Sequence, residues 1–333
     1  EKEFKQKYGF IEDDEGMKYQ PFFVKKNEKT ILENIDKIKE IYKQKKLNQI
    51  IILNTVERTQ EIYKKLKKLK NVLLYHSQFN FKDRRAKERK INDDFKNSRE
   101  PWIIVSTQAI EISVDISCDI MHTELAPADS IGQRGGRLNR GRKYHKNQFI
   151  MNIYKTEDNK PYCYSKNGEL LLKDSEDIIT EGPISYALIK GWCNSIYNKV
   201  ELEDTYLINI FKKCILFGHS VREVRGYSEE DNGSLVEIRE IKLITVDVLP
   251  SVIYNKRKTI IDLRNLQKYL VKIPYWRLTN SINNKLNYFI DKCNKHDRKI
   301  WICNISYNDE IGFEWNDTQT GFKDNQKDGT TFA

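Results

Sequence analysis

The sequence predicts an α/β protein built on a parallel sheet with helices on both faces, and three observations support this prediction. Five short runs rich in Val, Ile and Leu, typical of strands buried on both faces, lie within the first 155 residues. Helical patterns separate these runs, and the connections are short. Alternation of strand and helix predicts a doubly wound sheet. The predicted strands are residues 50–54, 72–77, 102–107, 119–124 and 149–154.

Three helices are predicted between these strands. Residues 30–46 carry apolar side chains at helical spacing, which indicates an amphipathic helix. Residues 56–69 form a second helix, and residues 82–95 form a third, strongly basic one that includes Arg85. The cations of the third helix either follow a nucleic-acid backbone or lie on an ordinary exposed face.

The composition of the chain changes after residue 155. We interpret residues 1–155 as one domain, the polar residues 156–182 as a linker, and residues 183–333 as a smaller mixed α+β domain. The expected elements of this last domain are helices at 183–199 and 202–217, a strand or hairpin arm at 235–250, short strands at 299–317 and a loose tail at 318–333.

Charge and composition limit the partners and the compartment. The 333 residues carry a formal net charge of +10, which fits a polyanion such as nucleic acid or a lysine-rich solvated surface. No apolar run is long enough to span a membrane. The 6 cysteines have no CxxC spacing, so we expect no metal site and a reducing cytoplasm. The chain begins at Glu1 without an initiator methionine, as expected of a fragment or a processed product.

Polar residues follow the predicted strands at their carboxyl ends, where ligands gather in open α/β sheets. These residues are Asn54, Thr55, His76, Ser77, Thr107 and Asp115. Asn54 and Thr55 precede a helix, where they either bind an anion or only cap the helix. Thr107 can donate its hydroxyl to a phosphate. Asp115 has apolar neighbours and needs a partner, either a ribose hydroxyl or a backbone amide.

The segment QRGGRLNR, residues 133–140, spaces three arginines around a glycine pair. Stability does not account for this pattern, because like charges repel and glycine costs a helix about 1 kcal/mol relative to alanine. An anionic ligand does account for it, because arginine grips phosphate oxygens and glycine permits close approach. On a helix that ends at Gly141, the arginines would span an arc of about 120°. A triphosphate would then meet Arg137 and Arg140 together; the alternative is a solvated basic helix end.

These motifs resemble those of a known family. STQAIEISVDI and QRGGRLNR resemble motifs V and VI of superfamily 2 helicases, and IIILNTVERTQEIYKKL resembles motif IV. The stretch that includes TELAPADSIGQRGGRLNRGRK is similar to the CRISPR-associated helicase of type I systems, most closely over residues 50–143. Ser113 stands where other superfamily 2 helicases often carry glycine. The resemblance implies a second RecA-like domain followed by a linker and a carboxyl-terminal domain.

The resemblance also implies roles for individual residues. Arg137 and Arg140 would be arginine fingers, with Gln133 near the nucleotide phosphates or the attacking water. Asp115 would meet the ribose hydroxyl, with Arg134 and Gly136 beside the nucleotide. The residues implied to contact nucleic acid are Asn54, Thr55, His76, Ser77, Arg85, Thr107 and Gln108.

Other parts of such a motor do not occur in this sequence. It contains no GxxxxGK[ST] loop, no DExH box and no His–Asp nuclease cluster, and FIEDDEGM at 10–17 is interpreted as a solvated acidic turn. We therefore expect ATP to be shared with a first RecA-like domain that also supplies the Mg²⁺ ligands. On its own the chain should be inactive.

The resemblance implies several partners and leaves two alternatives open. The implied partners are single-stranded DNA, the first RecA-like and nuclease domains in cis or trans, and a guide-RNA surveillance complex, with no membrane involved. The favoured function is one half of an ATP-dependent DNA helicase in type I CRISPR interference. The alternatives are a non-catalytic DNA-binding or docking module and half of a superfamily 2 RNA helicase.

Overall fold

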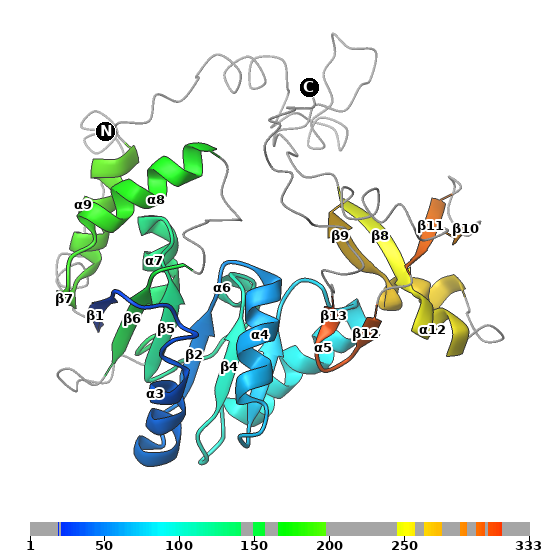
Figure 1. The fold of residues 1–333 in the computed structure, drawn as a ribbon, viewed down its shortest axis with the longest axis horizontal. Coiled ribbons are helices and arrows are strands. Elements are labelled where there is room, and N and C mark those ends of the chain that lie inside the picture. Colours follow the sequence, from blue (N-terminus) through cyan, green and yellow to red (C-terminus); the bar gives the residue numbers. More distant parts are fainter. Residues whose placement is uncertain are drawn as a thin grey trace, which may run out of the picture.

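A seven-stranded sheet forms the first part of the molecule, as the computed structural model shows (Figure 1). The strand order is β3-β4-β2-β5-β6-β1-β7, and every pairing is parallel except that of the edge strand β7. The structure describes residues 19, 21–140, 149–156, 166–197, 245–256, 263–274, 287–291, 298–303 and 306–314. The strands are β1 (Phe22–Asn27), β2 (Gln49–Ile52), β3 (Val72–Tyr75), β4 (Ile103–Ser106), β5 (Ile120–Glu124), β6 (Ile150–Tyr154) and β7 (Gly182–Ile184).

Helices cover both faces of this sheet because alternate strand residues point to opposite sides. Ile51 and Val105 pack with α3 and α4 on one face, whereas Ile50 and Ile104 pack with η2, α7 and α9 on the other. The helices are α3 (Ile35–Glu40), η1 (Ile41–Lys45), α4 (Val56–Leu66), α5 (Phe81–Arg89), η2 (Lys90–Phe95), α6 (Ile110–Ser113), α7 (Ala128–Gly135), α8 (Lys166–Ile178) and α9 (Tyr186–Tyr197).

The predicted fold class is confirmed. The five predicted strands correspond to β2 through β6, which are parallel and buried on both faces as their near-continuous apolar runs indicated. The predicted helices at 30–46 and 82–95 each divide into an α-helix and a π-helical turn. Strand β1 was not predicted, although its FFVKKN sequence pairs in parallel with β6 and completes the sheet.

The stretch interpreted as a linker contains regular structure. Helix α8 lies within residues 156–182, and β7 begins at its end and pairs antiparallel with β1. Ile179, Ile184 and Trp192 belong to the same apolar core as the sheet. Burial of these side chains therefore ties residues beyond 155 to the first sheet, while the division into domains stays a prediction.

A smaller mixed sheet forms the carboxyl-terminal part, as expected for this region. Its order is β10-β11-β8-β9, with β8 and β11 parallel and the other pairs antiparallel. Its elements are β8 (Thr245–Pro250), α12 (Ser251–Lys256), η4 (Leu263–Tyr269), β9 (Val271–Pro274), β10 (Asn287–Asp291) and β11 (Arg298–Cys303). The predicted helix at 202–217 and the tail at 318–333 lie outside the described residues, as does the acidic stretch 10–17.

A final hairpin, β12 (Ser306–Asn308) and β13 (Gly312–Glu314), docks on the first part of the molecule beside α5 (Figure 1). The Gln60 side-chain amide in α4 donates to the carbonyls of Ile311 and Phe313 at 3.1 and 2.5 Å. Gly312 has a φ of 82°, and a Cβ there would lie 2.8 Å from the Gln78 carbonyl oxygen. Only glycine fits both constraints, so the contact is closely packed.

Candidate nucleotide and nucleic-acid edge

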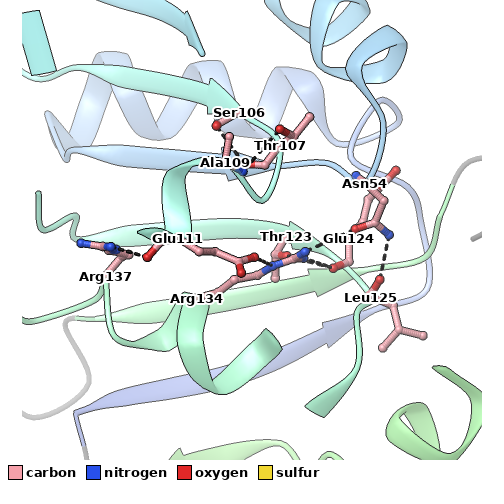
Figure 2. A network of polar contacts seen from close by, with 10 residues as sticks. All are labelled: Asn54, Ser106, Thr107, Ala109, Glu111, Thr123, Glu124, Leu125, Arg134 and Arg137. Atoms are coloured by element: carbon pink, nitrogen blue, oxygen red, sulfur yellow. Dashed lines mark hydrogen bonds and ion pairs between the residues drawn. The ribbon is translucent and has the colours of Figure 1, made fainter. Parts of the chain in front are cut away.

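A buried polar network lies at the carboxyl ends of β2 and β5, with Arg134 of α7 at its centre (Figure 2). The Arg134 side chain has no exposed surface. Its Nε is 2.8 Å from a Glu111 carboxylate oxygen, and one terminal nitrogen donates to the Thr123 hydroxyl at 2.5 Å and the Glu124 carbonyl at 3.1 Å. The other terminal nitrogen donates to the Asn54 amide oxygen at 3.4 Å. Arg134 thus joins three elements of its own fold.

A second buried ion pair extends this network. Arg58 of α4 lies 3.1 Å from the Glu124 carboxylate, whose exposed fraction is 1%. The Asn54 backbone N–H donates to the other Glu124 oxygen at 2.6 Å, and the Asn54 side chain donates to the Leu125 carbonyl at 2.9 Å. Charges removed from water in this way are held by partners on several elements, so each one depends on the others.

The arginines of QRGGRLNR do not lie on one helix, contrary to the sequence prediction. Helix α7 ends at Gly135 rather than at Gly141, and Gly136 caps it. Beyond it the chain follows residues 117–118: the Cys118 N–H donates to the Arg137 carbonyl at 2.9 Å, and the Arg140 N–H donates to the Ser117 hydroxyl at 3.1 Å. The glycine pair weakens the helix, and this backbone pairing replaces it.

The presence of glycine at position 135 has a structural reason that the sequence did not reveal. A Cβ built on Gly135 would overlap the ring of Phe22 in β1. Phe22, a residue of the same chain, therefore occupies the space that glycine leaves open at this position. At Gly136 the nearest atom to such a Cβ is the Gln133 carbonyl oxygen at 3.2 Å, and Gln133 itself is exposed. Of the two glycines, Gly136 is therefore the one open to an external ligand, beside the exposed Gln133.

Arg137 is almost buried and bonds to the backbone. Its two terminal nitrogens donate to the carbonyls of Val114 and Glu111, and Figure 2 shows its guanidinium turned away from that of Arg134. Burial lowers the pKa of Arg137, and the nearby Arg140 charge adds to this. A guanidinium has five N–H groups, so these two bonds leave donors for a further acceptor.

Arg140 and Asp115 form an exposed cluster with Lys96. Asp115 lies 2.6 Å from both the Arg140 guanidinium and the Lys96 ammonium, and its exposed fraction is 59%. The Lys96 hydrogen bond, with the charges of Arg140 and Lys96, lowers the pKa of Asp115. The expectation that Asp115 lies in apolar surroundings is wrong. Its sequence neighbours Val114 and Ile116 are buried, but Asp115 itself is exposed beside two cations.

Residues at two other strand ends are mostly internal. The Thr107 side chain is buried after β4, and its hydroxyl accepts from the Ala109 N–H at 3.4 Å, whereas Gln108 beside it is exposed. Thr55 caps α4 by accepting the Arg58 N–H at 3.3 Å, which is the capping alternative that the sequence left open. Asn54 is enclosed by the buried network described above.

His76 and Ser77 follow β3 and have opposite environments. His76 is fully buried, accepts the Gln78 N–H at Nδ1 and donates from Nε2 to the Ile311 carbonyl at 2.9 Å. Burial lowers the pKa of His76 to about 3, so its ring is neutral. The His76 ring is thus bonded to the hairpin formed by β12 and β13, whereas Ser77 is exposed. Arg85 is also exposed, on α5.

Sequence reasoning missed the carboxylates of the buried network. Glu111 and Glu124 each pair with a buried arginine, and Thr123 holds the Arg134 guanidinium. A signal was present, since Glu124 ends a strand predicted to be buried on both faces, where a charged side chain requires a buried partner. Within the described residues, no three His, Cys, Asp or Glu side chains lie where they could hold a metal ion. No helix among them is long and apolar enough to cross a membrane.

The parallel sheet with helices on both faces forms a RecA-like domain. The model of the Cas3 carboxyl-terminal family, "CRISPR-associated nuclease/helicase Cas3, C-terminal", matches residues 30–143. A putative CRISPR-associated nuclease/helicase Cas3 of Methanocaldococcus jannaschii is 34% identical over 94% of this chain and 45% of its own length. The Escherichia coli K12 Cas3 is 41% identical over 87 residues, 24% of this chain and 10% of its own. By sequence and by fold, this chain is similar to the carboxyl-terminal part of Cas3 proteins.

Solved structures support the same fold. T. fusca Cas3 with ADP superposes with a TM-score of 0.57 and 16% identity, over 78% of this chain and 36% of that one. T. fusca Cas3 with AMPPNP gives a TM-score of 0.55 and 18% identity, over 77% and 36%. The chain spans about half the length of its M. jannaschii relative and a smaller share of the others, and it corresponds to the family's carboxyl-terminal part.

Proposed function

We propose that this chain supplies the second RecA-like domain of an ATP-dependent DNA helicase that acts in type I CRISPR interference. The observation that carries the proposal is the cluster formed by Arg137, Arg140 and Asp115, in which both arginines contact residues 111–117. Arg140 and Asp115 are half-exposed. Arg137 lies beside them, and its two hydrogen bonds to backbone carbonyls leave guanidinium N–H groups for a ligand. Arg134, in contrast, is fully enclosed and serves the fold.

This arrangement suits a nucleotide shared between two domains. Arg137 and Arg140 would offset charge on the phosphates, Asp115 would accept from a ribose hydroxyl, and exposed Gln133 with Gly136 would border the same ligand. ATP supplies the phosphoryl group that is transferred, and Mg²⁺ ligands are expected from the first RecA-like domain. Because Asp115 is paired with Arg140 and Lys96, nucleotide binding requires exchange of those ion pairs.

In this proposal, only the exposed members of the predicted set contact nucleic acid directly. Ser77, Arg85 and Gln108 are accessible, and Thr55 is partly so. His76, Asn54 and Thr107 would act indirectly, by holding the turns that carry these residues. The Cas3 relatives are named as nuclease/helicases, and one solved structure is a CRISPR RNA-guided surveillance complex before nicking. These names support a nucleic acid and such a complex as partners, and single-stranded DNA is our proposal for the nucleic acid.

The test is a reconstituted ATPase. This chain should hydrolyse ATP negligibly alone and gain DNA-stimulated turnover when the first RecA-like domain is supplied. Arg137→Ala and Arg140→Ala should each lower that turnover by about 10³-fold or more, as removal of an arginine finger does. Arg99→Ala, which removes an exposed arginine just before β4, is the control and should change nothing. Turnover by the chain alone that survives Arg137→Ala would overturn the proposal.

A non-catalytic DNA-binding or docking role is the second candidate, and the net charge of +10 favours it. Salt-dependent single-strand binding without any ATPase after reconstitution would support it. If RNA rather than DNA stimulates the reconstituted ATPase, the chain belongs to an RNA helicase instead.

A further inference from the structure

Phe81 is the most exposed large apolar side chain among the described residues. Its exposed fraction is 51%, compared with 38% for Tyr197, the next highest. It is the first residue of α5, directly after the turn that leaves the carboxyl end of β3. Ser77 and Phe81 are exposed at the two ends of this turn, whereas Phe79 between them is buried and stacks on His76. An aromatic ring is therefore presented at the ligand-binding edge of the sheet.

One cation contacts the Phe81 ring, and two more lie on the same side of α5. The ammonium of one of these two, Lys82, lies 5.8 Å from the centroid of the Tyr269 ring. The Arg85 guanidinium lies 5.3 Å from the ring centroid, one helical turn further on. Lys82 and Arg89 are exposed on the same side of α5, at positions three and four residues from Arg85. No ion pair involves Lys82, Arg85 or Arg89 within the described part of the chain. This stripe of three cations and one aromatic ring is complementary to an anionic partner that also has flat apolar groups.

The acidic side chains of α5 do not neutralise this stripe. Glu88 accepts from the Tyr75 hydroxyl at 2.8 Å and pairs with Arg84 at 3.0 Å. Asp83 accepts from the Tyr307 hydroxyl at 2.6 Å and from the Asn80 side chain at 2.8 Å. Neither carboxylate pairs with the three cations of the stripe, and the FKDRRAKER sequence of α5 has more cations than carboxylates, so the stripe keeps a positive potential.

The backbone that carries Phe81 is held from two sides. The Asn80 side chain caps α5 by accepting the Asp83 N–H at 2.8 Å. The Asn80 N–H donates to the Tyr307 hydroxyl at 3.1 Å, which anchors the turn to the carboxyl-terminal hairpin. A ring on a fixed backbone loses little conformational freedom when a flat group stacks on it.

We propose that Phe81 is a stacking residue for one unpaired base of single-stranded nucleic acid, with Lys82, Arg85 and Arg89 beside the neighbouring phosphates. The inference rests on the proposed function, in which this chain binds single-stranded DNA, and adds a base contact to it. Aromatic rings bind bases in this way without regard to sequence, because every base has a π-face. A paired base inside a duplex offers no face to Phe81, so the contact selects single strands.

The experiment uses the full chain and a short oligothymidylate with one central 2-aminopurine, whose fluorescence falls when it stacks on an aromatic ring. A second oligonucleotide has abasic positions throughout and the same phosphates. Phe81→Ala should weaken binding to the first by about 5- to 150-fold, the range measured for loss of one base stack, and abolish the quench. Phe81→Trp should restore both. The abasic strand should bind the variant and the unchanged protein alike.

Control variants separate stacking from charge and from folding. Tyr186→Ala removes an aromatic side chain of 36% exposure from α9 and should leave binding unchanged. Phe81→Ala should keep the salt dependence of binding, because it removes no cation. Arg85→Ala should reduce the log–log salt slope by about 0.7, the value for one phosphate contact on a single strand.

The outcomes distinguish this inference from the proposed function. Equal losses on the normal and abasic strands, or no loss with Phe81→Ala, would overturn the stacking role while leaving the helicase proposal intact. Binding by the unchanged protein that ignores salt would contradict the nucleic-acid role as a whole. Tighter binding of a duplex than of a single strand would show that Phe81 serves another partner.

Discussion

Arg134 and Arg140 are six residues apart in one segment and have opposite environments. Arg134 is completely buried and bonds to Glu111, Thr123 and Asn54, which belong to different elements. Arg140 has an exposed fraction of 49% and pairs with the exposed Asp115. An arginine motif in a sequence therefore combines residues that build the fold with residues that face a ligand, and burial separates the two.

The same contrast recurs after β3, between two adjacent residues. His76 is enclosed by the carboxyl-terminal hairpin, whereas Ser77 is exposed. Since each buried group is fixed by several partners, its replacement should affect stability first, and replacement of its exposed neighbour should affect ligand binding.

Arg134→Ala should have the largest effect on stability. It leaves the Glu111 carboxylate, 7% exposed, without its ion-pair partner, and removal of one member of a buried pair costs about 3–5 kcal/mol. Urea unfolding of the variant and the unchanged protein measures this difference in the free energy of unfolding. Because the penalty arises from an unpaired carboxylate, adding Glu111→Gln should recover part of it. A loss below about 1 kcal/mol would mean that Arg134 is not structural.

Gly135→Ala should have the next largest effect. The new Cβ would overlap the Phe22 ring, and overpacking of this kind costs about 1–3 kcal/mol. Gly191→Ala in α9, where no atom lies within 4 Å of the new Cβ, is the matched control and should be neutral or slightly stabilising. Thermal unfolding compares the two. If Gly135→Ala instead keeps full stability and loses nucleotide binding, the glycine serves the ligand after all.

The pH dependence of stability should report the buried histidines. Burial lowers the pKa of both His76 and His122 to about 3, whereas in the unfolded chain a histidine titrates near 6.5. Between these values the unfolded state binds more protons, so stability falls as pH falls, by at most about 1.4 kcal/mol per pH unit for each histidine. Urea unfolding from pH 7 to pH 5 should show this slope.

His76→Gln tests the share of one histidine in that slope. The variant should lose about half of the pH dependence contributed by these two residues, whatever its stability at pH 7. An unchanged slope would show that His76 is accessible to protons in the native state, and hence that the hairpin does not enclose it in solution.

The sequence predicted five strands of the sheet correctly, but it did not show which residues of QRGGRLNR are buried and which are exposed. Continuous apolar runs identified β2 through β6, because burial on both faces leaves no alternation to misinterpret. Strand β1 was missed because FFVKKN ends in three polar residues and so lacks the continuous apolar run of the predicted strands. The burial of Arg134 and His76 could not be predicted, since it depends on Glu111, Thr123 and Ile311, which only the folded chain brings near them.

Arg140→Ala should have the smallest effect on stability, within about 0.5 kcal/mol, because exposed ion pairs contribute little. Asp115 keeps Lys96 as a partner at 2.6 Å, so the substitution leaves no unpaired charge. The Arg140 charge contributes to the lowered pKa of Asp115, which should rise toward its ordinary value in the variant, as measured by carboxyl NMR titration. Turnover of the reconstituted ATPase should nevertheless fall far more than stability. Arg134→Ala would give the reverse balance, and equal effects on stability in the two variants would remove the distinction between the buried and the exposed arginine.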